Sequence, residues 1–238
     1  DFSVAADQAR RETFEAAPDG WRDATVTLEG RLNELSNNAI AAAPTPSANR
    51  FLGEALYTAR ARLLGQASDE EYAARGAWQV DTGRAAIDTW AGVVAADPDQ
   101  YDAALAQTRE TLGGVSDANA RRDLTTLADG AFAAAAVQGM IERNPSATLR
   151  ALRDPDAGGP IAALGADRSR FIAAAENEVE RRAARWRASV RDAAASAAAA
   201  WEMGVEPDNA PSVETVRAAL GDADALEYEA RQLAFGSA

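Results

Sequence analysis

The side chains able to do chemistry in this protein are carboxylates and guanidinium groups, because its 238 residues include neither cysteine nor histidine. Without these two residue types there is no Cys/His zinc site, no serine–histidine or cysteine nucleophile, no disulfide and no imidazole proton shuttle. Two carboxylates alone suffice to cleave a glycosidic bond. Calcium binding and acid-dependent glycan cleavage are therefore the activities to test against the sequence.

One segment begins in the manner of a calcium-binding loop. Asp154 and Asp156 are two residues apart, and Gly158 and Gly159 follow them. A full loop needs more oxygen ligands and a bidentate glutamate at its twelfth position, which is Gly165 here. A turn between two helices explains the same proline, aspartate and glycine residues. We expect no metal site and no cofactor.

The glutamates suited to acid or base catalysis stand at positions that helix stability already explains. Some lie in the expected first turn of a helix, where negative charge is favourable, and others lie on a charged helix face. Glu178 is spaced to pair with Arg182 four residues later. We therefore expect no catalytic residue and no enzymatic activity, and a carboxylate-dependent glycan hydrolase is only the third hypothesis. The glutamates considered are Glu70, Glu71, Glu176, Glu178 and Glu180.

The charge balance bears on the partners of the protein. The chain has 24 basic residues, all of them arginine, against 37 acidic ones, and its net charge is −13. This balance disfavours binding to a phosphate backbone, and no apolar run approaches the ~20 residues of a membrane span. The one dense basic cluster spreads around its helix, which favours solvated arginines paired with glutamates over a nucleic-acid or lipid stripe. It comprises Arg181, Arg182, Arg185, Arg187 and Arg191.

The composition predicts an all-α fold. Alanine, leucine, arginine and glutamate favour helices, and no stretch alternates β-branched and polar residues over the length of a strand. We expect an irregular multi-helix bundle or a short helical-hairpin array, with its longest helix in the C-terminal half. Prolines, glycines and capping residues place the helices at 3–17, 21–43, 47–64, 68–96, from 98, from the cap at 116–117 to 143, from 145, 167–203, 212–220 and 222–234.

Five sequence features mark helix starts. Ser68 to Glu71 has the pattern of a capping box. Asp97 and Asn144 each precede a proline, and Asp117 and Asp167 precede long helices, so these side chains are expected to cap the helices that follow.

The same prolines, glycines and capping residues predict the domain organisation. We expect an N-terminal helical pair over 1–43, a central helical domain over 47–203 and short C-terminal helices over 211–235. The central domain contains two imperfect hairpin units, 97–143 and 144–203, in which a short helix precedes a longer one. Because the chain begins with Asp1 rather than with methionine, we expect a processed product or the ordered part of a longer protein.

Two apolar stripes indicate which helix faces are buried. In the helix over 68–96 the stripe includes Gly76 and Gly83, which predicts a close helix crossing. The helix over 167–203 would be about 55 Å long, more than a small domain covers, so its stripe is a candidate interaction surface. We expect chains to associate through it. The candidate residues are Phe171, Val179, Trp186, Val190 and Trp201.

The sequence pattern of residues 50–235 resembles that of the alanine- and arginine-rich helical internal virion, or ejection, proteins of tailed bacteriophages. These proteins are often associated with peptidoglycan transglycosylase domains. The likeness is carried by runs in which a helix ends at a dipeptide with proline, a short helix bears an Ala-Leu pair and an arginine-rich long helix follows. These are Leu56–Arg60, Asp97–Tyr101 and Gln138–Pro145, continuing through Leu149, Leu152, Leu164, Arg168, Arg170 and Ala174 to Ala175.

The resemblance implies a non-enzymatic structural component of a phage or phage-like particle. Such a protein would lie in the capsid interior or the tail, with other copies of itself and other virion proteins as partners and no sequence-specific nucleic acid or stable membrane span. The chain lacks the Glu-Ser dipeptide and Gly-Leu-Met-Gln stretch of the transglycosylases, so no catalytic residue is carried over. The alternative is a cellular, cytoplasmic helical-repeat adaptor that binds a protein partner.

Overall fold

A computed structural model describes residues 2–236 and confirms the all-α fold. This part of the chain is 86% helical, with ten α-helices and no strand. Three short 3-10 turns lie at Pro18–Gly20, Pro98–Gln100 and Gly165–Asp167. The helices are α1 (Phe2–Ala16), α2 (Ala24–Ala41), α3 (Pro46–Ala96), α4 (Tyr101–Leu112), α5 (Ala118–Arg143), α6 (Pro145–Arg153), α7 (Gly159–Ala163), α8 (Arg168–Glu202), α9 (Val213–Leu220) and α10 (Asp222–Gly236).

Contacts divide the chain into two compact units. The first contains residues up to 94 together with 99–132, and the second contains 95–98 together with the residues from 133 onward. The boundary falls inside α5 and near the end of α3. The predicted division into 1–43, 47–203 and 211–235 is based on the positions of prolines and not on contacts, and it stays a prediction.

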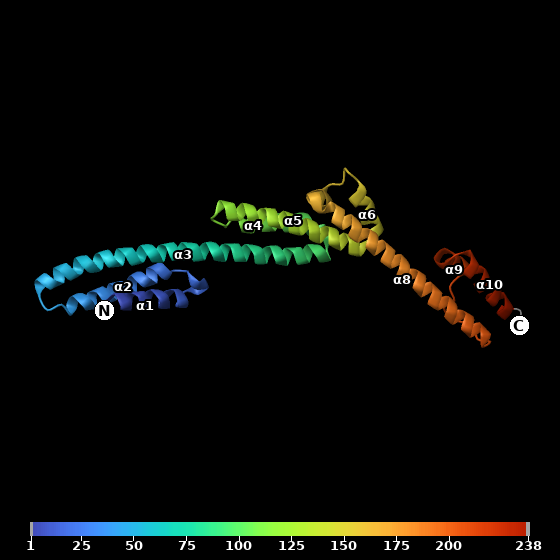
Figure 1. Cartoon of the computed structure of the whole chain (residues 1–238), viewed down its shortest axis with the longest axis horizontal. Helices are drawn as coiled ribbons and strands as arrows, with labels where there is room; N and C mark the ends of the chain where they lie inside the picture. Colours follow the sequence, from blue (N-terminus) through green and yellow to red (C-terminus); the bar gives the residue numbers. More distant parts are fainter. Residues whose placement is uncertain (1, 237–238) are drawn as a thin grey trace. The chain divides into compact units, whose positions relative to one another are not determined.

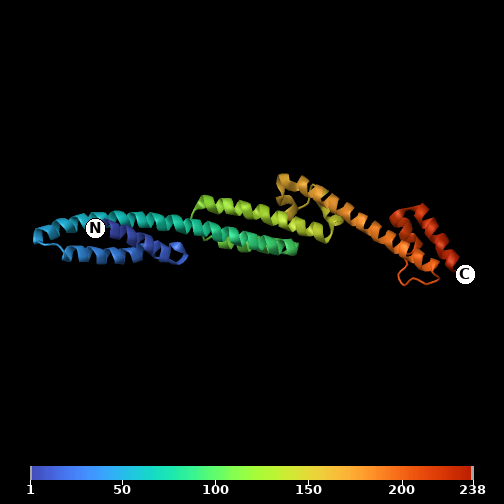
Figure 2. The same cartoon turned by 60° about the horizontal axis from the view of Figure 1, so that its bottom comes forward.

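In the first unit, α1 and α2 lie along the N-terminal half of α3 (Figures 1 and 2). The three helices share a core built from leucine and alanine, whose small side chains let the backbones approach closely. Phe2, Phe14, Leu35 and Leu64 cover this core at its edges. The buried residues are Ala6, Ala9, Leu28, Leu32, Leu63 and Ala67.

The helix α3 is one continuous helix of 51 residues, so the predicted break between 64 and 68 is wrong. Leu63 and Ala67 both belong to the core with α1 and α2, and their burial holds this stretch helical. The predicted capping box therefore lies in mid-helix. Glu71 instead accepts the backbone N–H of Thr25 at 2.9 Å, so it caps the start of α2 from a neighbouring helix.

The prediction that the longest helix lies in the C-terminal half is also wrong for the described residues. The helix α8 has 35 residues, fewer than α3. Its start differs as well, because Asp167 forms no side-chain hydrogen bond to the backbone of α8. The preceding 3-10 turn places Asp167 in helical backbone geometry, which is unlike the extended geometry of a capping residue.

Of the three other predicted caps, those at Asp117 and Asn144 are present, and the helix start at Asp97 differs from the prediction. Asp117 accepts the N–H groups of Asn119 and Ala120 at the start of α5, and Asn144 accepts that of Ala147 in α6. After Asp97 the chain first forms a 3-10 turn, so the α-helix begins only at Tyr101.

The C-terminal half of α3 buries a different face from the N-terminal half. Gly83 and Ile87 follow Leu63 and Ala67 by 20 residues, which at about 100° per residue turns them to nearly the opposite side of α3. There α4 and the first part of α5 lie beside α3 (Figures 1 and 2). A Cβ at Gly83 would lie 3.0 Å from Leu112 and from Leu124, which confirms the close crossing predicted there.

The predicted crossing at Gly76 is wrong, because no atom lies within 4 Å of the Cβ position. A closer crossing occurs at Gly139 of the second unit, which the sequence analysis did not assign to packing. A Cβ at Gly139 would lie 2.2 Å from the carbonyl oxygen of Ala95 and 2.9 Å from Cγ of Pro98. Only glycine fits this contact without a backbone shift.

The second unit also contains α6, α7, α8, α9 and α10. α6 packs against α8, and α9 and α10 pack against the C-terminal part of α8 and against each other. Trp201 and Tyr228 lie at the centre of this packing, with ring centroids 5.1 Å apart, and the Tyr228 hydroxyl donates to the carbonyl of Pro211. The buried cluster is Val190, Ala197, Trp201, Val216, Ala219, Ala225 and Tyr228.

Within residues 2–236, α5 is the one helix long and apolar enough to cross a membrane by length and composition. Of its most apolar 18-residue window, 44% is buried inside the protein. Phe132, Ala136 and Val137 are completely buried. The expected absence of a membrane span stays a prediction.

Adding one methyl group at Gly139 should destabilise the second unit. The Gly139→Ala variant must move the α5 backbone or the Ala95 carbonyl, and we expect the free energy of unfolding to fall by about 1–3 kcal/mol. Gly130 in the same helix has open space around its Cβ position and serves as the control. Gly130→Ala should raise stability by up to about 1 kcal/mol. Urea unfolding followed by circular dichroism measures both, and equal stabilisation by the two substitutions would contradict the crossing.

Candidate interaction surfaces

The segment at Asp154 forms a turn that its own residues complete. The Asp154 carboxylate accepts the N–H of Asp156 at 3.0 Å, and the Asp154 carbonyl accepts a hydrogen bond from Arg168. The Arg168 guanidinium also donates to the Leu152 carbonyl at 2.8 Å, which joins the end of α6 to the start of α8. No group of three acidic side chains within residues 2–236 is arranged to hold a metal ion.

Most of the glutamates considered for catalysis connect one helix to another. Glu70 pairs with Arg10 of α1, and Glu176 pairs with Arg153 of α6 at 2.5 Å. Glu71 caps α2, as described above. These contacts assign the carboxylates to helix packing.

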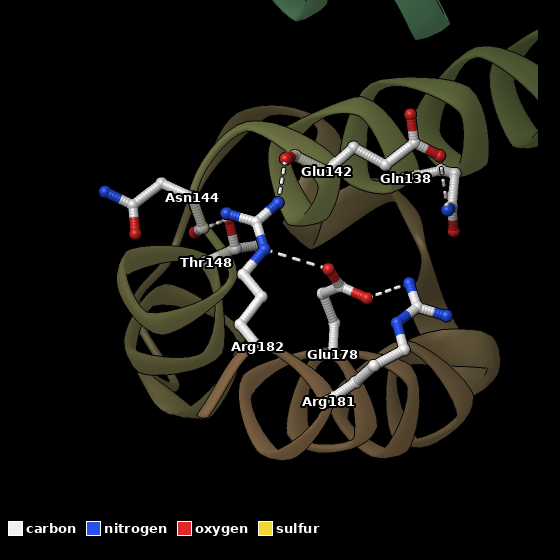
Figure 3. Close-up of polar contacts among 7 residues, drawn as sticks. All are labelled: Gln138, Glu142, Asn144, Thr148, Glu178, Arg181 and Arg182. Carbon is white, nitrogen blue, oxygen red and sulfur yellow. Dashed lines mark hydrogen bonds and ion pairs between the residues drawn. The ribbon is translucent and has the colours of Figure 1, made fainter. Parts of the chain in front are cut away.

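Glu178 is the one glutamate of the set that is buried, with only 8% of its surface exposed. Its carboxylate accepts hydrogen bonds from Arg182 at 2.8 Å and from Arg181 (Figure 3). The predicted i+4 pair is confirmed, and the charged face predicted for Glu178 is buried at this residue. Arg182 also donates to the backbone carbonyl of Glu142 at the end of α5, so one guanidinium ties α8 to α5 (Figure 3).

The hydrogen bond from Arg182 lowers the pKa of Glu178 below its ordinary value of 4.5. Burial opposes this shift, and the positive charge of Arg181 adds to it. The carboxylate is therefore ionised at neutral pH. A group held in this state is a poor general acid, and it functions here as a fixed negative charge between two arginines.

The five candidate stripe residues fall into two sets. Phe171, Val190 and Trp201 are buried by other parts of the chain. Arg170 covers the ring of Phe171, whereas Val190 and Trp201 belong to the core with α9 and α10. Val179 is half-buried, and Trp186 is 45% exposed. The proposed interaction role of the stripe stays a prediction, with Trp186 as its open position.

Trp186 and its neighbours form a surface that we call the α8 window, defined by Val179, Ala183, Arg185, Trp186 and Arg187. Residues 184–189 are all exposed, because the packing with α6 ends before them and the packing with α9 and α10 begins at Val190. Arg185 and Arg187 form no ion pair with any residue in the range 2–236, so the prediction of glutamate-paired arginines holds for Arg181 and Arg182 only.

A second exposed apolar surface lies on α10 and was missed in the sequence analysis. Leu226 is 61% exposed and Leu233 is 67% exposed, and they are seven residues apart on one side of the helix. Ala230 and Glu229 lie beside them. We call Leu226, Glu229, Ala230 and Leu233 the α10 outer face. The i, i+7 leucine spacing was the available signal.

Aromatic side chains are also uncovered on α3. Phe51, Tyr57 and Tyr72 are each more than 70% exposed. Tyr72 lines a groove of about 430 Å³ together with Gly76, Val80 and Val115, at the place where the α4–α5 connection stops covering α3.

Comparison with known proteins found no family model, no curated protein and no solved structure that matches this chain.

The lowered pKa of Glu178 predicts a pH-dependent contribution to stability. Because the folded state favours the ionised form, this contribution is present above about pH 4.5 and is lost as the pH falls through the folded-state pKa. We therefore expect Glu178→Gln to destabilise the protein at neutral pH and to approach wild-type stability in acid. Urea unfolding at a series of pH values measures the difference.

The control for this experiment is Glu180→Gln, which removes an exposed glutamate of the same helix with no ion pair in the described chain. Its stability should follow the wild type at every pH. A Glu178→Gln variant that stays equally destabilised from neutral to acidic pH would contradict an electrostatic role for this carboxylate.

Proposed function

We propose that this protein is a non-enzymatic structural component of a phage or phage-like particle, internal or tail-associated, that acts by helix-mediated assembly. The observation that carries the proposal is the set of large apolar side chains left uncovered on its long helices. Phe51, Tyr57 and Tyr72 on α3 and Trp186 on α8 are open to solvent. Exposed apolar side chains mark sites of interaction between proteins where they lie together in a patch.

The roles of the charged residues support a structural function. Glu70 and Glu176 pair with arginines of other helices, and Glu71 accepts a backbone N–H of α2. Glu178 pairs with Arg182 of its own helix, which in turn binds the end of α5, so all four carboxylates contribute to the positions of helices. A catalytic carboxylate pair would need one acid with a raised pKa. Glu178 has a lowered one.

The particle itself is proposed from the resemblance of residues 50–235 to internal virion proteins. The runs Leu56–Arg60, Asp97–Tyr101 and Gln138–Pro145 carry that resemblance. A second candidate is a cellular adaptor, which is favoured by the groove beside Tyr72 on α3 because a groove of this size accepts side chains of a partner helix.

The two candidates predict different locations for the protein. If it is a particle component, it should co-purify with density-gradient-purified particles released by the organism that encodes it. Quantitative mass spectrometry of those particles should give a fixed number of copies per particle across preparations. The matched control is an abundant cytoplasmic protein from the same lysate, which should be lost during purification. Recovery of this chain only with cellular proteins would reject the particle and favour the adaptor.

A further inference from the structure

The apolar face of α8 is covered at both ends and open between them. Phe171 and Ala175 are buried towards its N-terminus, and Val190 and Ala197 are buried towards its C-terminus. Trp186 lies on the same side of the helix by its spacing, at 11 residues from Ala175 and 11 from Ala197. An unfilled site of about two helical turns is thus left in an otherwise buried stripe.

The charges around this site are unusual for the protein. Arg185 and Arg187 flank Trp186 and project about 100° to either side of it. Neither has a carboxylate partner among residues 2–236, although the whole chain has a net charge of −13. Tryptophan and arginine are the side chains most enriched at the energetic centres of protein interfaces. The α8 window therefore fits an acidic helix with an apolar side.

The α10 outer face has these properties. Leu226 and Leu233 supply an apolar ridge, and Ala230 between them allows close approach. Glu229, beside this ridge, has no ion pair in the described part of the chain. The ridge and the window are therefore complementary both in apolar character and in charge.

The two surfaces of a single chain are not in contact. α10 uses Ala225 and Tyr228 to pack against α8 and α9, and Leu226 points to another side of the helix, where it is 61% exposed. The helix cannot turn both sides towards α8 of its own chain. An α10 outer face that fills the window must therefore belong to a second molecule.

We propose that the α10 outer face of one copy of this protein docks into the α8 window of another copy. Because the two surfaces differ, each copy keeps one free window and one free outer face after the first contact. Such a head-to-tail interface generates a ring if it closes and a filament if it does not. The proposal rests on the assembly role proposed above and specifies its contact. It also explains how strongly acidic chains attract one another, since the window is the locally basic surface that each copy offers.

Two variants with complementary defects test this interface. The window variant is Arg185→Glu/Arg187→Glu, and the outer-face variant is Leu226→Gln/Leu233→Gln. All four positions are exposed, so folding should be preserved, and circular dichroism checks the helix content. The matched control is Arg11→Glu/Arg62→Glu, which changes the net charge equally at exposed positions of other helices.

Sedimentation velocity over a concentration series gives the readout. Wild type and the Arg11/Arg62 control should form species larger than dimers, and each complementary variant alone should be monomeric. An equimolar mixture of the two variants should form dimers and nothing larger, because one intact window then meets one intact outer face. A mixture that stays monomeric, or a wild-type chain that is monomeric at every concentration, would overturn the proposal.

The outcomes separate this interface from the proposed function. If wild type and both variants associate equally, the proposed contact is wrong while assembly through another surface, such as α3, stands. If the equimolar mixture of the two variants forms dimers but the protein is absent from purified particles, the proposed contact is supported and the proposed particle role is rejected.

Discussion

Close approach between helix backbones, made possible by alanine and glycine, is the constraint on which the rest of this structure depends. At Gly139 the backbone of α5 passes so near the Ala95 carbonyl that even a methyl group would overlap it. Ala6, Ala9 and Ala67 have a similar function between α1, α2 and α3. Small side chains permit this proximity but bury little apolar area each, so other interactions must hold the helices in place.

Arginine supplies many of those interactions. Its guanidinium has several donors in a fixed plane and can bind more than one acceptor at once. Arg182 binds both the Glu178 carboxylate and the last turn of α5, and Arg168 binds two carbonyls at the end of α6. In both cases the positive charge lies near the C-terminus of a helix, where the helix dipole favours it. Charged residues thus hold helices together that a larger apolar core would otherwise hold.

A core made of small side chains also leaves some helix faces uncovered. The stripe of α8 is buried against different neighbours at its two ends and is open at Trp186, and α3 changes its buried side along its length. The α8 window is apolar and basic, although the whole chain has a net charge of −13. A partner that covers such faces stabilises the folded protein. The proposed α10-to-α8 contact rests on this property, whereas the proposed particle role rests in addition on the resemblance of residues 50–235 to internal virion proteins.

The sequence by itself determined the helical fold, because alanine and arginine content and the lack of strand periodicity act locally. It also determined the caps at Asp117 and Asn144, which need only the side chain and the N–H groups two or three residues later. It located the i+4 pair of Glu178 with Arg182 for the same reason. Of the two crossings predicted at glycines only that at Gly83 is present, because Leu112 and Leu124 pack there. Tertiary structure decided what depends on distant partners. It made α3 continuous by burying Leu63 and Ala67, turned Glu71 into a cap for another helix, and buried Trp201 while leaving Trp186 exposed. Periodicity shows which side of a helix is apolar, but only the packed neighbours determine where along the helix that side is covered.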